Sequence, residues 1–164
     1  MMSSINEWCV PSNRGWGNVA FDAQILHQNT GMLEHSVNLT GKFWYRAGLN
    51  ADPPKHGHLM DDFRITLLQV LIPRSACEQL LSDFEVWLTT RTFFRCSLVS
   101  EPDQFVMLEV GERSGLTSTR EHPVLTFCYE GAGCCLEVFF VVDQSCISKA
   151  RDSLTRVLQS FDAQ

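Results

Sequence analysis

The stretch that decides the fold is FRITLLQVLIPRSACEQLLSDFEVWL, residues 63–88. Residues 63–72 are almost continuously apolar, which is typical of a central strand covered on both faces. After Pro73, Ser75 and Glu78 have the spacing of a capping box, in which two side chains satisfy backbone N–H groups at a helix start. The apolar residues that follow recur at helical spacing and predict a helix with one face on a sheet: Cys77, Leu80, Leu81, Phe84, Trp87 and Leu88.

Two strands are predicted upstream of this helix, in addition to the one that leads into it. Residues 19–26 place alternate apolar side chains on one face, and residues 37–46 do the same. The turn residues 29–31 between them favour antiparallel pairing. Before them, residues 1–17 contain a proline and two glycines, and we expect an irregular start there.

Four more strands are predicted downstream, at 93–99, 104–110, 124–130 and 134–142, joined by short turns that favour an antiparallel meander. Asp143 or Ser145 can cap a final amphipathic helix. The predicted order is βββαββββα. This order indicates an α+β fold, a mostly antiparallel sheet of about six to seven strands with two amphipathic helices. We expect residues 1–164 to form a single domain.

Composition restricts the classes of function. The formal net charge is −6 and the chain has three lysines, so no basic stripe is available to neutralise a nucleic-acid backbone. The apolar runs are too short for a membrane-spanning helix, and the first residues lack the basic and apolar regions of a secretory signal. Seven cysteines are an odd number, and several lie in apolar periodic segments as small hydrophobic residues do. We therefore expect a cytoplasmic protein that binds neither nucleic acid directly nor a membrane.

Motifs for catalysis and cofactors are missing from the sequence. No phosphate loop, dinucleotide fingerprint, G-x-S-x-G elbow or H-E-x-x-H helix is present. One group of potential zinc ligands lacks the paired C-x-x-C spacing, and we expect core cysteines there instead: His122, Cys128, Cys134, Cys135 and Cys146. The sequence therefore predicts a protein that is not an enzyme and that has no cofactor, no catalytic residues and no metal site.

Three kinds of enzyme chemistry nevertheless stay open. His56 and His58, in a predicted loop over residues 47–62, could bind a metal with Asp61 or Asp62, and a cysteine and a histidine distant in sequence could form a nucleophilic pair. Carboxylates at strand ends could perform acid–base chemistry or be solvated loop charges: Glu101, Asp103, Glu109, Glu112, Glu121 and Glu130.

Trp44 stands among polar residues on the face of its strand that should meet water. Two interpretations are open. An exposed tryptophan often anchors an interface, whereas a helix or the amino-terminal segment could instead cover this face.

A capped helix that ends in Trp87-Leu88 is followed by a strand at 93–98, the turn Glu101-Pro102-Asp103 and a further strand. In these features residues 62–161 resemble small bacterial immunity proteins, the cognate inhibitors of contact-dependent and polymorphic toxins, of the type that protects against wall-associated toxins. Four strands and a capped terminal helix also fit their general plan. The sequence departs from them at 130–133, Glu-Gly-Ala-Gly, where a Pro-Pro-Trp-like segment is expected.

The resemblance implies a non-enzymatic protein that binds and neutralises a cognate toxin effector domain in the cytoplasm. An acidic surface suits this role, because it can occupy the basic cleft of a toxin that acts on nucleic acid. A small Cys- or metal-dependent enzyme and a secretion chaperone or adaptor are the alternatives. The expected partner-binding residues lie in the loop at 47–62, on the face of Trp44 and in the acidic turns: Trp44, Asp52, His56, His58, Asp61, Asp62, Glu101, Asp103, Glu112 and Glu121.

Overall fold

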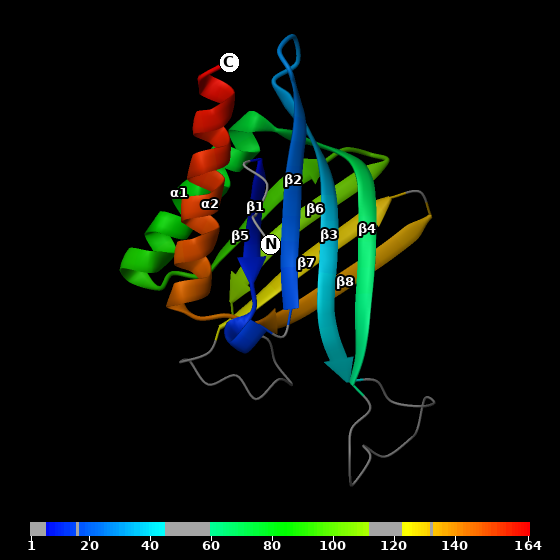
Figure 1. The fold of residues 1–164 in the computed structure, drawn as a ribbon, viewed down its shortest axis with the longest axis vertical. Coiled ribbons are helices and arrows are strands. Elements are labelled where there is room, and N and C mark those ends of the chain that lie inside the picture. The colour runs from blue at the N-terminus through cyan, green and yellow to red at the C-terminus, as the bar shows by residue number, and fades with distance from the viewer. Residues whose placement is uncertain (1–5, 16, 45–59, 112–122, 132) are drawn as a thin grey trace, which may run out of the picture.

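The computed structural model describes residues 6–15, 17–44, 60–111, 123–131 and 133–164. Within these ranges the chain is an α+β protein: two four-stranded antiparallel sheets face each other, and two helices lie along one side (Figure 1). The elements in chain order are β1 (Glu7–Pro11), a short 3-10 helix η1 (Asn13–Gly15), β2 (Gly17–His27), β3 (Met32–Trp44), β4 (Met60–Pro73), α1 (Arg74–Thr90), β5 (Phe94–Ser100), β6 (Gln104–Gly111), β7 (Val124–Gly131), β8 (Cys134–Val141) and α2 (Gln144–Asp162).

The predicted α+β class, antiparallel pairing and two helices are confirmed, but the single sheet of six to seven strands is wrong. Strands β1–β4 form the first sheet and β5–β8 the second, each in sequential order. The observed order is ββββαββββα, one strand more than predicted. The additional strand is β1, which lies in the start that was expected to be irregular. Its alternation covers only five residues, of which Trp8 and Val10 point into the core.

Strand β4 departs most from the sequence prediction. It begins at Met60, inside the segment expected to be a loop, and it is an edge strand rather than a central strand. Its pairing with β3 shifts between His35 and Val37, and Gln69 adopts a left-handed backbone with φ 56°. This β-bulge lies beside Leu68, whose side chain is 71% exposed. The apolar run at 63–72 therefore contains both buried and exposed residues, and the prediction that both faces of this strand are covered is wrong.

The second sheet is the meander that the sequence predicts. Inward-facing side chains of neighbouring strands lie opposite one another. For example, Leu108 is opposite Phe127, and Phe127 is opposite Val138. Because side chains alternate between the faces, the residues between these positions form the outer face. Arg95 lies there and pairs with Glu109 of the neighbouring strand.

Both helices form where the apolar stripes predict, but their starts differ. Helix α1 has Pro73 at its N-cap and no side-chain cap, so the predicted Ser75–Glu78 capping box is wrong. The helix begins at Arg74, directly after β4, and Glu78 binds Arg74 instead. In α2 the predicted cap is confirmed, because Asp143 accepts a hydrogen bond from the backbone N–H of Cys146 at 3.0 Å.

One hydrophobic core joins the two sheets and both helices. Phe21 of the first sheet contacts Phe127 of the second, with ring centroids 6.1 Å apart. Helix α2 packs against β1, α1 packs against β5, and the helices contact each other, so they close one side of the sandwich (Figure 1). Trp87 is buried, as its place in the stripe predicts. None of the described helices combines the length and apolar character needed to cross a membrane.

Candidate functional site

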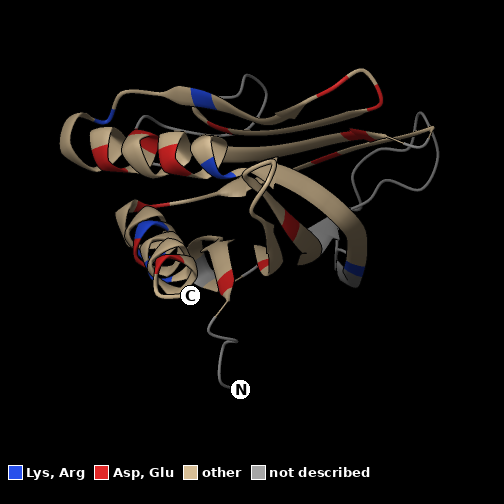
Figure 2. Cartoon of the chain, turned by 90° about the horizontal axis from the view of Figure 1, so that it is seen from above, with Lys and Arg blue, Asp and Glu red and all other residues tan. Residues whose placement is uncertain are grey.

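Three exposed carboxylates gather at one end of the second sheet, and we call this group the acidic end: Glu101, Asp103 and Glu130. The β5–β6 turn is held by two backbone hydrogen bonds between Glu101 and Gln104, which leave both turn carboxylates in solvent. The register of β6 with β7 then places Glu130 opposite Phe105, next to the turn. Figure 2 shows acidic positions on this turn and beside it.

The acidic end borders a shallow depression. Its walls come from the β5–β6 turn, the end of β7 and the start of β8. Gly131 permits this packing, because a Cβ there would lie 2.7 Å from the hydroxyl oxygen of Tyr129. Gly133 has φ 74°, which lets the chain turn into β8 at no steric cost. Among the described residues, none of the three acidic-end carboxylates forms an ion pair. Within the described ranges, the site therefore presents negative charge that no cation pairs with.

Two thiols lie beside the acidic end. Cys134 and Cys135 are exposed, and the Cys135 thiol lies 4.0 Å from a Glu130 carboxylate oxygen. The expectation of core cysteines is therefore wrong for these two residues. It is confirmed for Cys77, Cys96 and Cys146, which are buried. Burial raises the pKa of Cys77 to about 12 and that of Cys96 to about 11, so neither thiol is a nucleophile at neutral pH.

The residues weighed as potential zinc ligands do not gather at one place within the described part of the chain. Cys146 is buried on α2, Cys134 and Cys135 are exposed on β8, and His122 lies outside the described residues. More generally, the described ranges contain no cluster of three or more His, Cys, Asp or Glu side chains arranged to hold a metal ion.

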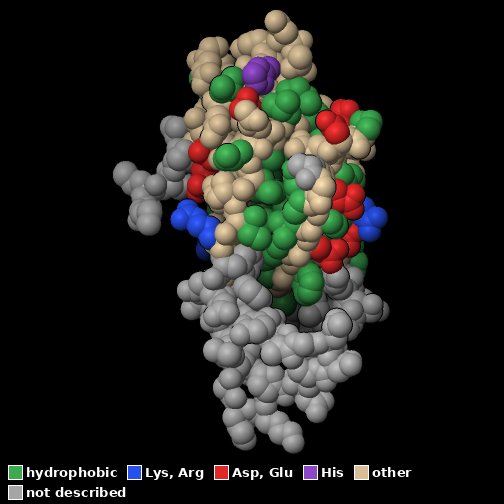
Figure 3. Space-filling model, turned by 90° about the vertical axis from the view of Figure 1, so that its right-hand side faces the viewer, with side chains coloured by type: hydrophobic (Ala, Val, Ile, Leu, Met, Phe, Trp, Pro, Cys, Tyr) green, Lys and Arg blue, Asp and Glu red, His purple; other side chains and the backbone are tan. Residues whose placement is uncertain are grey.

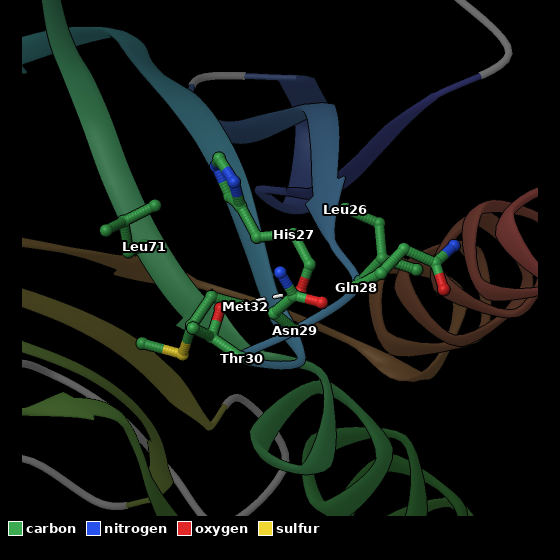
Figure 4. A pocket seen from close by; sticks show the side chains of 7 residues that line it. All are labelled: Leu26, His27, Gln28, Asn29, Thr30, Met32 and Leu71. Atoms are coloured by element: carbon green, nitrogen blue, oxygen red, sulfur yellow. Dashed lines mark hydrogen bonds between the residues drawn. The ribbon is translucent and has the colours of Figure 1, made fainter.

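A second depression lies at one end of the first sheet, around the turn between β2 and β3 (Figure 4). It is lined by residues of this turn and by Leu71 of β4. His27 forms a 3.1 Å contact with Glu34 on the exposed face, and Thr30 bonds the His27 carbonyl oxygen. These contacts hold the turn, and its polar side chains do not converge on a common point in Figure 4.

A third feature is an apolar surface between the free edges of the two sheets. It comprises five half-buried side chains on the inner faces of β4 and β8, which we call the apolar mouth: Ile65, Leu67, Leu136, Val138 and Phe140. Figure 3 shows hydrophobic side chains in a band between the sheets at this side of the molecule.

The structure brings together only part of the predicted site. Glu101 and Asp103 are adjacent in one turn. Trp44, Asp61 and Asp62 lie where β3 ends and β4 begins, with Trp44 paired to Met60, at the other end of the molecule (Figure 1). The remaining predicted residues lie outside the described ranges: Asp52, His56, His58, Glu112 and Glu121.

The sequence prediction did not place Glu130 or the apolar mouth in the binding site. Glu130 was visible as a carboxylate at a strand end, but its neighbours depend on the β6–β7 register. The mouth depends on which strands form the sheet edges, and alternation along one strand carries no such signal. Comparisons with protein-family models, curated proteins and solved structures found no match to this chain.

Proposed function

We propose that this protein is a non-enzymatic immunity protein that binds a cognate toxin effector domain in the cytoplasm and neutralises it. The observation that carries the proposal is the acidic end, where Glu101 and Asp103 present their charge on a short turn of the second sheet and Glu130 presents its charge from the end of β7. Rigid turns keep the cost of ordering an interface small, because few backbone torsions are lost on binding.

The charge suits a basic partner. Toxins that act on nucleic acid present basic clefts, and carboxylates that enter such a cleft both accelerate association and block the substrate's path. The turn Glu101-Pro102-Asp103 also belongs to the segment that resembles immunity proteins. Both arguments point to the same end of the molecule.

The test uses the carboxyl-terminal domain of the protein encoded immediately upstream of this protein's gene, which the proposal expects to be the toxin domain. We expect co-expression of the two proteins to restore growth and the purified proteins to form a 1:1 complex. Glu101→Lys combined with Glu130→Lys should weaken the complex at least 100-fold. The matched control is Glu85→Lys combined with Asp152→Lys, which makes the same charge change on exposed helix positions and should have little effect.

Failure of the upstream domain to bind, together with absence of growth rescue, would contradict the function. Equal binding by both double variants would contradict only the role of the acidic end.

A secretion chaperone or adaptor is the second candidate, and the apolar mouth favours it. Such a protein must hold an apolar segment of its client. It would bind the client without silencing any toxic activity, so the growth assay separates the two functions.

A further inference from the structure

The chain repeats one structural unit. Strands β1–β4 form a sequential antiparallel sheet and lead into α1, and strands β5–β8 form a second sequential antiparallel sheet and lead into α2. We call the elements from β1 to α1 the first half and those from β5 to α2 the second half. Apart from the short η1, the two halves have the same element order, ββββα, and the same sheet topology.

The strand–helix junctions of the two halves match position by position. Leu71 and Val141, 70 positions apart in the chain, are 38% and 37% exposed, and the residues that follow them, Ile72 and Val142, are fully buried. The same offset relates the buried stripes of the two helices: Cys77, Leu80, Phe84 and Trp87 in α1, and Ile147, Ala150, Leu154 and Val157 in α2. Residue types differ at all of these positions, so the repeat lies in the pattern of burial.

Each helix packs against the other half. Among the strands, α1 packs mainly along β5, the first strand of the second half, and α2 packs mainly along β1, the first strand of the first half (Figure 1). In the first contact, the ring centroids of Phe84 and Phe94 lie 5.8 Å apart. In the second, the backbone N–H of Cys9 donates to Ser153 Oγ at 3.2 Å. The exchange of helices is therefore reciprocal.

The interface between the halves consists of side-chain packing. Among the described strands, none of the first half pairs with one of the second. Phe21 meets Phe127 across the core, and Arg74 at the start of α1 pairs with Asp162 at the end of α2. These contacts depend only on which residues meet. They would be the same if the second half belonged to another copy of the chain.

One short linker, residues 91–93, determines which second half meets the first. It reverses the chain, so that β5 runs back along α1 from Phe84 toward Ala76. The reversal uses the left-handed backbone of Arg91, φ 59°, which is strained for a residue with a Cβ. Straightening the linker relieves this strain and carries β5 away from its own α1, so that the α1 of a second copy can receive it.

We propose that the protein is built from two repeats of one ββββα unit with exchanged helices, and that two copies of the chain can exchange whole halves by straightening the linker at 91–93. The partner at this interface is a second copy of the same chain. Each assembled unit then contains the first half of one copy and the second half of the other. This inference does not depend on the proposed toxin-binding function.

The test uses the full chain with an altered linker. Deletion of Thr92 leaves too few residues to reverse the chain easily, whereas insertion of Gly-Ser-Gly-Ser after Thr92 allows the reversal without strain. After refolding from guanidinium chloride at high protein concentration, we expect the deletion variant to contain roughly tenfold more dimer than the wild type and the insertion variant to be monomeric. Size-exclusion chromatography with light scattering measures the masses, and circular dichroism shows whether each species is folded.

A crosslink identifies which chain supplies each half. Arg74→Cys combined with Asp162→Cys places two thiols across the interface between the halves, where a short bismaleimide can join them. The background is a chain whose exposed Cys134 and Cys135 are serine. In a half-exchanged dimer this link joins two chains, which a denaturing gel resolves. The matched control, Arg74→Cys combined with Glu78→Cys, places both thiols on α1 and should link within one chain in every species.

Links between chains in the dimer, together with links within one chain in the monomer, would support the exchange of halves. A dimer that gave only links within one chain would be a surface association and would overturn the inference. Should the deletion variant fail to fold, the wild type refolded at high concentration undergoes the same crosslinking. Absence of links between chains in every folded species would likewise overturn the inference, whatever the outcome of the toxin-binding experiment.

Discussion

Trp8 Nε1 donates a hydrogen bond to His35 Nε2 at 3.2 Å within the core, and this bond fixes the protonation state of the histidine. The second ring nitrogen, Nδ1, lies 2.9 Å from the Leu33 carbonyl oxygen, which can only accept a hydrogen bond. Nδ1 therefore carries the proton, and the ring is neutral. Burial lowers the pKa of His35 to about 4.

The first prediction concerns acid stability. Between pH 6.5 and about 4, the unfolded chain binds a proton at residue 35 that the folded chain excludes. The contribution to the free energy of unfolding is therefore complete above pH 6.5 and is lost as the pH falls toward 4, by about 3 kcal/mol. Urea denaturation at several pH values measures this loss. His35→Gln should flatten the pH dependence in this window.

The second prediction concerns the end of α1. Arg91 has φ 59°, and its guanidinium donates to the carbonyl oxygens of Trp87 and Leu88 while its Cζ lies 4.6 Å above the Trp87 ring centroid. Arg91→Ala loses these contacts and keeps the left-handed backbone, so we expect it to lower the free energy of unfolding by about 1–3 kcal/mol. Arg91→Gly loses the same contacts but removes the steric strain, and it should be more stable than the alanine variant by about 1 kcal/mol. Chemical denaturation of the pair gives the order, and a glycine variant less stable than the alanine variant would refute this account.

The third prediction concerns the two helix starts. Asp143→Ala removes the N-cap of α2 and should cost about 1 kcal/mol near pH 7. The hydrogen bond from Ser145 is the largest of several effects that lower the pKa of Asp143, so this contribution is present above pH 4 and lost as the pH falls below it. Ser75→Ala should change stability by less than about 0.5 kcal/mol, because Ser75 caps nothing. Thermal unfolding of the two variants measures the difference. Equal losses of stability in Asp143→Ala and Ser75→Ala would mean that Ser75 does cap α1, as the sequence predicted.

The fourth prediction concerns thiol reactivity. Cys134 and Cys135 should react first with a colourless disulfide reagent in the native protein, and Cys77, Cys96 and Cys146 only after unfolding. The fast phase should disappear when Cys134 and Cys135 are both changed to serine. A fast phase that survived this change would point to a reactive cysteine elsewhere and favour the thiol-enzyme alternative.

Local patterns in the sequence predict most of the elements. The stripe from Cys77 to Leu88 and the four downstream strands agree with the structure, because their periods reflect burial against a single core. Alternation does not reveal where a sheet ends. Helix α1 separates β4 from β5, and the chain then starts a second sheet rather than extending the first. The sequence predicted a central strand for β4 because residue type alone does not distinguish an exposed apolar residue, such as Leu68, from a buried one.

The candidate site was predictable where turn chemistry forms it and hidden where distant strands form it. The proximity of Glu101 and Asp103 could be predicted, because both lie in one turn of four residues. Glu130 joins them through the β6–β7 pairing, and the apolar mouth forms only when two sheets are stacked. The exposure of Cys134 and Cys135 could not be predicted for the same reason. Both lie on β8, an edge strand of its sheet, and the sequence around a cysteine does not reveal whether its strand lies at the edge or in the centre of a sheet.

The bulge at Gln69 has a consequence for solution behaviour. A long, flat strand edge with exposed leucines is a template on which identical chains stack into fibrils. Gln69 turns the backbone out of the strand conformation in the second half of β4, next to the most exposed of these leucines. Continuous pairing along this edge is therefore interrupted, and stacked copies could not keep their backbones in register. We therefore expect the left-handed backbone at Gln69 to oppose edge-to-edge stacking of copies along β4.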